Sequence, residues 1–223
     1  YPMHSERLRS VIQGPRIMDF FAGLFGVPAR SYDFIWLRHQ PPSHGIAPHC
    51  DTVFMGRGTP DVLSCWIPFG DIALRGGGLM LLENSHRSSQ QRLADYLRQD
   101  VDTYCENGPN GEAIKTGEMR WEHWRDYAAR KDWSGEITGD ALELSEAWGG
   151  RWLTAPEYRM GDVLLFTLRT VHAGTDNESD TIRLSTDSRY QRADQPIDER
   201  WIRGEHGEDP IGHGLAAKQG KIC

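Results

Sequence analysis

The sequence predicts a mainly β protein with flanking helices, built around a double-sheet β roll, or jelly roll. Twenty-four glycines and 12 prolines among 223 residues indicate many turns and short strands. Strand-like runs lie both before and after a charged segment at 88–150, so strands from both sides must share one core. Strands and helices do not alternate regularly, and no glycine-rich phosphate loop is present, which disfavours an α/β sheet.

The elements follow in order along the chain. Apolar residues spaced three to four apart predict helix over residues 5–25, interrupted near Gly14–Pro15. A β-rich run at 33–37 leads to Pro41–Pro42. Further strand-like runs lie at 61–69, 78–82, 162–168 and 182–191, helical patches lie at 89–99, 119–130 and 140–148, and a polar tail begins at about Asp194. We expect one domain over 1–223, with a core at about 33–87 and 151–193 and a helical insertion at about 88–150.

Composition excludes several classes of protein. A net charge of −7 gives no electrostatic footprint for nucleic acid, and the longest apolar stretches are too short to span a membrane. The four cysteines show no CxxC spacing, which disfavours a structural zinc site and a disulfide framework. We therefore expect a reduced cytoplasmic protein. The chain opens on Tyr1 instead of Met, as a trimmed N-terminus would.

The tripeptide His49–Cys50–Asp51 is a candidate for metal binding. On an extended segment, residues two apart point to the same face, so His49 and Asp51 present an imidazole and a carboxylate together while Cys50 turns away. A third ligand must come from elsewhere. Two histidines and one carboxylate, with three positions left open, form the arrangement of non-haem Fe(II) oxygenases. The tripeptide alone is too common to indicate such a site.

A second informative stretch runs over 171–191. His172 follows the apolar run at 162–168, and the segment after the next loop alternates. Ile182, Leu184, Thr186 and Tyr190 share one face, and Arg183, Ser185, Asp187 and Arg189 share the other. The charged face lies either in water or inside the roll. Inside, Arg183 would be the innermost charge and would need an anion, for which a carboxylate is the natural mate. The alternation of residues does not show whether the charged face lies in water or inside the roll.

The four pieces together resemble a known family. HCD at 49–51, GGLMLLENSHR at 77–87, His172, and Arg183 eleven positions later are similar in order and spacing to the phytanoyl-CoA dioxygenase family. Its members are Fe(II)- and 2-oxoglutarate-dependent oxygenases on a double-stranded β-helix (jelly-roll) core. The resemblance extends from about Trp36 to Arg200, and the match of all four pieces is much more specific than any one of them.

The resemblance implies a reaction and roles for four residues. His49, Asp51 and His172 are implied to be the iron ligands and hence catalytic, and Arg183 to pair with the distal carboxylate of 2-oxoglutarate. The remaining iron positions are implied to take 2-oxoglutarate and O2. The implied reaction oxidises a C–H bond of a small organic molecule while 2-oxoglutarate becomes succinate and CO2. The carboxylate at Asp51 implies hydroxylation or a related oxidation, and disfavours halogenation.

Three further residues have two interpretations each. Trp66, 17 residues after His49, matches a family tryptophan near the co-substrate or is a core aromatic. Arg38, at the end of its strand, occupies a place where relatives carry a basic residue facing the site, or is solvated. Arg57, in a tight turn, contacts an acidic substrate or lies in water. His86 is expected to belong to a structural turn and not to bind metal.

Two questions stay open at this stage. Trp121 and Trp124, on one helical face, either dock the insertion onto the roll or form a lid over a substrate pocket. The rivals to an oxygenase are a non-catalytic binding module on the same roll and a cupin-like metalloenzyme that does not use 2-oxoglutarate. The substrate and the oligomeric state are not indicated, although the absence of a basic cluster argues against a CoA phosphate site.

Overall fold

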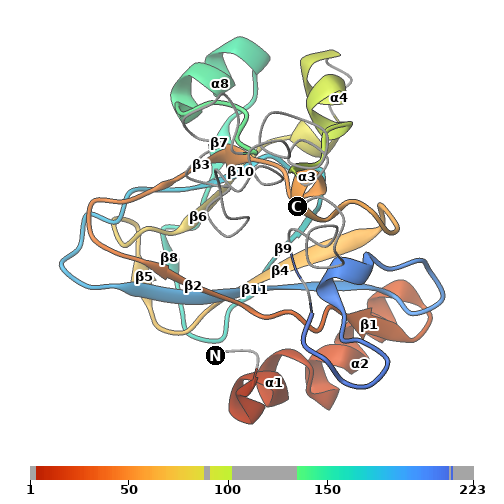
Figure 1. The fold of residues 1–223 in the computed structure, drawn as a ribbon. Helices are drawn as coiled ribbons and strands as arrows, with labels where there is room; N and C mark the ends of the chain where they lie inside the picture. The colour runs from red at the N-terminus through yellow and green to blue at the C-terminus, as the bar shows by residue number, and fades with distance from the viewer. Residues whose placement is uncertain (1–3, 88–90, 102–134, 211, 213–223) are drawn as a thin grey trace, which may run out of the picture.

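The computed structural model describes residues 4–87, 91–101, 135–210 and 212. Two antiparallel sheets face each other, with helices beyond both of them (Figure 1). The first sheet contains β1 (Ala29–Ser31), β11 (Arg183–Arg192), β4 (Val62–Pro68) and β9 (Leu164–Thr167) in that order, and β2 (Trp36–Gln40) also pairs with β11. The second sheet has the order β3 (Ile46–His49), β10 (His172–Gly174), β6 (Leu79–Leu82) and β7 (Trp152–Leu153). A small third sheet joins β5 (Ile72–Ala73) to β8 (Glu157–Tyr158). This architecture confirms the predicted β roll.

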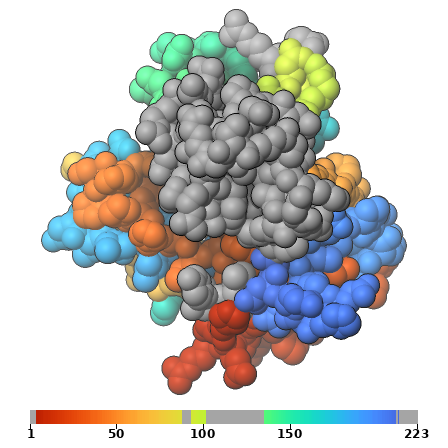
Figure 2. All heavy atoms as spheres, viewed as in Figure 1, coloured from red at the N-terminus to blue at the C-terminus, as the bar shows by residue number. Residues whose placement is uncertain are grey.

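The helices flank the two sheets. They are α1 (Glu6–Ile12), α2 (Pro15–Phe25), α3 (Thr52–Met55), α4 (Gln91–Leu97) and α8 (Ala141–Trp148), with 3-10 turns η2 (Ser85–Arg87) and η4 (Glu199–Trp201). Helices α4 and α8 lie at one end of the molecule and α1 at the other (Figure 1; Figure 2). In the described segments, none of the helices has the length and hydropathy needed to cross a membrane.

The N-terminal helices cover the outer face of the first sheet. Pro15 occupies the first turn of α2, as the break at Gly14–Pro15 predicts, and the helix ends at Gly26 with a φ of 69°. Phe21 is fully buried and stacks on Tyr190 of β11, with ring centroids 3.9 Å apart. Tyr190 therefore points toward the helices, on the outer face of the first sheet.

The opposite face of β11 lies between the two sheets. Its four polar residues are less than one tenth exposed, whereas Ile182 and Leu184 are 59% and 45% exposed. The charged side of this strand is therefore inside, which confirms the interior interpretation over the solvated one. The four residues are Arg183, Ser185, Asp187 and Arg189.

Several elements differ from the sequence-based expectation. Strands β1 and β3 are short and have no clear pattern of their own. The backbone at Asp51 is helical (φ −65°, ψ −22°) and begins α3, so this residue is not on an extended segment. The start of the polar tail is packed against the rest of the protein, because Arg200 and Trp201 are buried in η4. Helices α4 and α8 confirm two of the three helical patches; the third, at 119–130, lies outside the described residues.

Candidate active site

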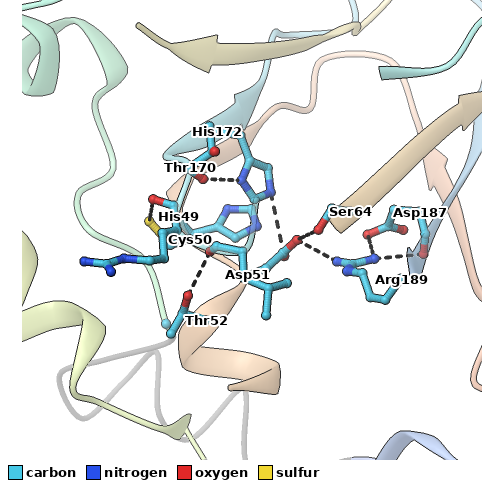
Figure 3. A network of polar contacts seen from close by, with 12 residues as sticks. His49, Cys50, Asp51, Thr52, Ser64, Thr170, His172, Asp187 and Arg189 are labelled. Atoms are coloured by element: carbon cyan, nitrogen blue, oxygen red, sulfur yellow. Dashed lines mark hydrogen bonds and ion pairs between the residues drawn. The ribbon is translucent and has the colours of Figure 1, made fainter. Parts of the chain in front are cut away.

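Three potential metal ligands converge between the sheets. His49 ends β3, Asp51 directly precedes α3, and His172 begins β10 directly opposite His49 in the sheet register. One ligand atom from each side chain lies within 4.8 Å of the other two, and Figure 3 shows the three side chains pointing toward one another. Cys50 points away from the three candidate ligands, as predicted, and is fully buried in an apolar cluster. Its side chain points away because the chain turns here, and not because the segment is a strand.

Both imidazoles are oriented by the backbone. Nδ1 of His49 lies 2.8 Å from the carbonyl oxygen of Ala47, and Nδ1 of His172 lies 3.0 Å from that of Thr170. A carbonyl oxygen can only accept, so each Nδ1 carries the hydrogen and each Nε2 keeps its lone pair for a metal. Burial, together with the nearby His172, lowers the pKa of His49 to about 3, so its ring is neutral at pH 7.

The two oxygens of Asp51 have different surroundings. Oδ2 accepts hydrogen bonds from the Ser64 hydroxyl (2.5 Å) and from Nη2 of Arg189 (2.8 Å). Oδ1 lies toward the histidines, 3.8 Å from Nε2 of His172. Burial alone would raise the pKa of Asp51, but Arg189, the histidines and Ser64 outweigh it and hold that pKa below its usual value. Asp51 is therefore an anion.

A chain of alternating charges extends from Asp51 through the first sheet (Figure 3). Nη1 of Arg189 lies 3.0 Å from Asp187, and the Arg189 guanidinium lies over the ring of Trp36. Arg38 then binds both oxygens of Asp187, at 2.8 and 3.0 Å. Burial opposes ionisation of Asp187, yet the two arginines hold its pKa below the ordinary value. Each buried charge in this chain has an opposite charge beside it.

Arg183 differs, because its partners are neutral. Its guanidinium donates to the carbonyl of Gly77 (2.9 Å), to the hydroxyl of Ser185 and to the side-chain oxygen of Gln40. No salt bridge joins it to a carboxylate of the described chain. Burial lowers the pKa of Arg183 to about 10, so the side chain is still a cation at pH 7. A buried cation without an anion is costly, and this position is suited to receive an anionic ligand.

The structure also places the other residues that the sequence singled out. Trp66 is buried, with its ring 5.6 Å from Cζ of Arg183 and packed edge-on against Tyr158. Arg38 is connected to the site through Asp187, whose two oxygens it binds and which lies beside Arg189. Arg57 forms an ion pair with Asp100 (2.6 Å).

His86 lies in η2, outside the group of potential metal ligands. It is exposed, and its Nε2 contacts Arg87. The structure thus agrees with the expectation that His86 belongs to a turn.

Sequence analysis missed the two donors to Asp51 and two of the partners of Arg183. Arg189 and Ser185 were recognised as part of an alternating face, without a role. Ser64 and Gln40 had no signal of their own, since each acts on a residue far away in the chain. Arg189 did have one usable signal in the sequence, because it shares a face with Arg183. If that face is buried, a second cation on it needs a carboxylate of its own.

The donor set fits Fe(II). Two imidazole nitrogens and one carboxylate oxygen are the ligands of the non-haem Fe(II) oxygenases. Together with facing antiparallel sheets and a buried arginine between them, they define the class of Fe(II)- and 2-oxoglutarate-dependent oxygenases.

The comparison with protein families gives the same class. The model of the phytanoyl-CoA dioxygenase (PhyH) family matches residues 3–185, and the chain belongs to that family. Membership confirms the predicted enzyme class, with iron and 2-oxoglutarate as its cofactor and co-substrate. No curated protein sequence matches the chain significantly.

Solved structures share the fold at low sequence identity. The carbocyclase SnoK of nogalamycin biosynthesis has a TM-score of 0.59 at 19% identity over 96% of this chain and 66% of its own. The epimerase SnoN, in complex with Fe3+, alpha ketoglutarate and nogalamycin RO, has 0.58 at 21% identity over 94% and 70%. EctD from S. alaskensis, with 2-oxoglutarate and 5-hydroxyectoine, has 0.57 at 16% identity over 96% and 62%. The SnoN and EctD structures thus contain small molecules in the same fold, and this chain spans about two thirds of the length of the three proteins.

Proposed function

We propose that this protein is an active Fe(II)/2-oxoglutarate-dependent dioxygenase that hydroxylates, or otherwise oxidises at a C–H bond, a small organic molecule. The observation that carries the proposal is the pairing of the His49–Asp51–His172 group with Arg183, a buried cation whose hydrogen-bond acceptors among the described residues are all neutral. Bound Fe(II) supplies the activation of O2 that is coupled to conversion of 2-oxoglutarate to succinate and CO2.

The protein's own residues would position the reactants. His49 and His172 offer their Nε2 atoms and Asp51 offers Oδ1, so the metal is held from one side. Arg183, kept in place by Gly77, Ser185 and Gln40, would bind the distal carboxylate of 2-oxoglutarate through its guanidinium. Burial of these groups excludes water, which strengthens the charge interactions.

Three assignments are part of the same proposal. Trp66, beside Arg183, would border 2-oxoglutarate, and Arg38 would border it from β2, where it lies on the same face as Gln40, a partner of Arg183. Arg57 would contact an acidic group of the substrate in competition with Asp100.

The organisation and location of the chain are also proposals. We infer one oxygenase domain over 1–223, with a core at about 33–87 and 151–193 and an insertion at about 88–150. A reducing compartment such as the cytoplasm is supported by the free, buried thiols of Cys50 and Cys65.

The test is turnover of 2-oxoglutarate. Protein supplied with Fe(II), ascorbate and O2 should form succinate from 2-oxoglutarate, at a rate that a matching substrate increases. Arg183→Met keeps the side-chain volume and removes a charge-assisted contact worth about 1.5–3 kcal/mol, so the KM for 2-oxoglutarate should rise about tenfold or more. Arg192→Met, an exposed position on the same strand, should leave KM unchanged.

Two outcomes would decide against the proposal. Failure to bind Fe(II), with no succinate formed, would favour a non-catalytic binding module. Metal-dependent activity without O2 consumption, and insensitive to Arg183→Met, would favour a cupin-like metalloenzyme that does not use 2-oxoglutarate.

A further inference from the structure

Asp51 is the only member of the candidate metal site whose donor group has two equivalent ligand atoms. A free carboxylate can bind a metal through one oxygen or both. Here Oδ2 already accepts two short hydrogen bonds, from Ser64 and Arg189, and Oδ1 faces the histidines. The protein has therefore made the two oxygens inequivalent before any metal binds.

Arg189 is itself rigidly held. Nη1 donates to the backbone carbonyl of Asp187 (2.8 Å) and lies 3.0 Å from its carboxylate, while the guanidinium rests over the ring of Trp36. The side chain is fully buried. Asp187 is in turn fixed from its far side by Arg38. Because a planar guanidinium with these contacts cannot turn, Nη2 defines where Oδ2 of Asp51 lies.

We propose that Arg189 is a positioning residue that holds Oδ2 of Asp51 and so restricts this ligand to one-oxygen binding through Oδ1. The consequence is that Asp51 occupies a single position on the metal, which leaves room for the two oxygens of 2-oxoglutarate and for O2. The inference rests on the proposed function, because it concerns how the same site holds its metal.

A purely structural role for Arg189 makes a different prediction. In that case the arginine only compensates the buried charges of Asp51 and Asp187, and any cation of similar size would serve. A positioning role needs the planar donor at a fixed distance. The two roles are separated by a variant that keeps the charge but changes the geometry, Arg189→Lys, and by Ser64→Ala, which changes the geometry of Oδ2 without any charge.

The experiment measures Co(II) binding to the metal-free protein without O2. Affinity is obtained by calorimetry, and the visible spectrum of the bound Co(II) reports its coordination number. We expect Arg189→Gln to weaken Co(II) binding about 10–100-fold, the usual effect of removing a group that orients a metal ligand. Arg189→Lys and Ser64→Ala should weaken it less and should change the spectrum toward a higher coordination number. Arg192→Met is the matched control, and circular dichroism checks that each variant is folded.

The outcomes separate this inference from the proposed function. If the unmodified protein does not bind Co(II), the proposed function itself fails. If it binds Co(II), and Arg189→Lys and Ser64→Ala retain its affinity within about threefold and its spectrum, Arg189 has only a structural role. Should Arg189→Gln not fold, the lysine and alanine variants still decide, since neither leaves an unpaired buried carboxylate.

Discussion

At the scale of single residues, the same local hydrogen bond orients both histidines. Each ring donates from Nδ1 to the carbonyl of the residue two positions earlier, Ala47 for His49 and Thr170 for His172. Because the acceptor is backbone close in the chain, the shape of the segment itself orients the ring, and no distant side chain is needed. The Nε2 atoms therefore face the metal position even when the neighbouring side chains vary.

Removal of one imidazole should abolish metal binding without unfolding the protein. His172→Ala removes one of the three candidate ligands found among the described residues, so binding of Fe(II) or Co(II) should become undetectable at concentrations that saturate the unmodified protein. Circular dichroism should still show the β fold. His86→Ala is the control, because His86 is exposed and lies outside the ligand group, and its metal affinity should be unchanged. Near-normal affinity in His172→Ala would refute the ligand assignment.

The difference between the residues that sequence analysis found and those it missed has a physical reason. His49 and Asp51 are neighbours in the chain, and a short-range pattern reveals them. Ser64 and Arg189 lie 13 and 138 positions away from Asp51 in the sequence, so only the sheet register brings them together. The alternation of β11 was visible in the sequence, but which face is buried depends on the position of α2, which no pattern within β11 contains.

At the scale of elements, α4 is tied to the segment that carries two of the candidate metal ligands. The hydroxyl of Tyr96 in this helix accepts a hydrogen bond from the backbone N–H of Cys50 (3.0 Å) and donates one to the carbonyl of Gly135 (2.6 Å). Cys50 lies between His49 and Asp51. One buried hydroxyl thus joins α4 and Gly135 to the segment that carries two candidate ligands.

Tyr96→Phe should therefore weaken both the fold and the metal site. The variant leaves the buried N–H of Cys50 without an acceptor, which costs about 1–3 kcal/mol of the free energy of unfolding. Because this N–H lies beside both ligands, Co(II) affinity should fall several-fold. Tyr158→Phe is the matched control: its hydroxyl donates to the carbonyl of Leu79 (2.7 Å), away from the ligands, so it should lose stability and keep its metal affinity. Equal affinities in the two variants would contradict the coupling.

The contact between α2 and the first sheet should act on stability alone. Phe21 is fully buried against Tyr190, and truncation of a buried phenylalanine costs about 3–5 kcal/mol. Phe20, next to it, is 50% exposed, so Phe20→Ala should cost much less. Denaturant unfolding gives both values. Metal affinity of the folded Phe21→Ala protein should be unchanged, because Phe21 lies on the outer face of the sheet; a large loss of affinity would show that the outer packing also controls the site.

At the scale of the whole molecule, the candidate site joins the two sheets. The imidazoles come from the second sheet, on β3 and β10, whereas the donors that hold Asp51 come from β4 and β11 of the first. Among the described residues, the buried apolar side chains form four clusters, and the one that contains Phe21 lies on the outer face of the first sheet. The sheets are thus connected at the site by charged and polar contacts, and a bound metal would add a further connection.

Metal binding should therefore stabilise the entire fold. The ligands come from segments far apart in the chain, so the unfolded state offers no comparable site, and a metal at about 100 times its Kd should add about 2.7 kcal/mol to the free energy of unfolding. For a chain of this length, each kcal/mol raises Tm by about 2–4 °C, so Co(II) should raise Tm by about 5–10 °C in differential scanning calorimetry. A chelator should reverse the shift, and His172→Ala should show none. An equal shift in His172→Ala would mean that the stabilising metal binds elsewhere, and no shift would mean that the folded protein does not bind the metal more tightly than the unfolded chain does.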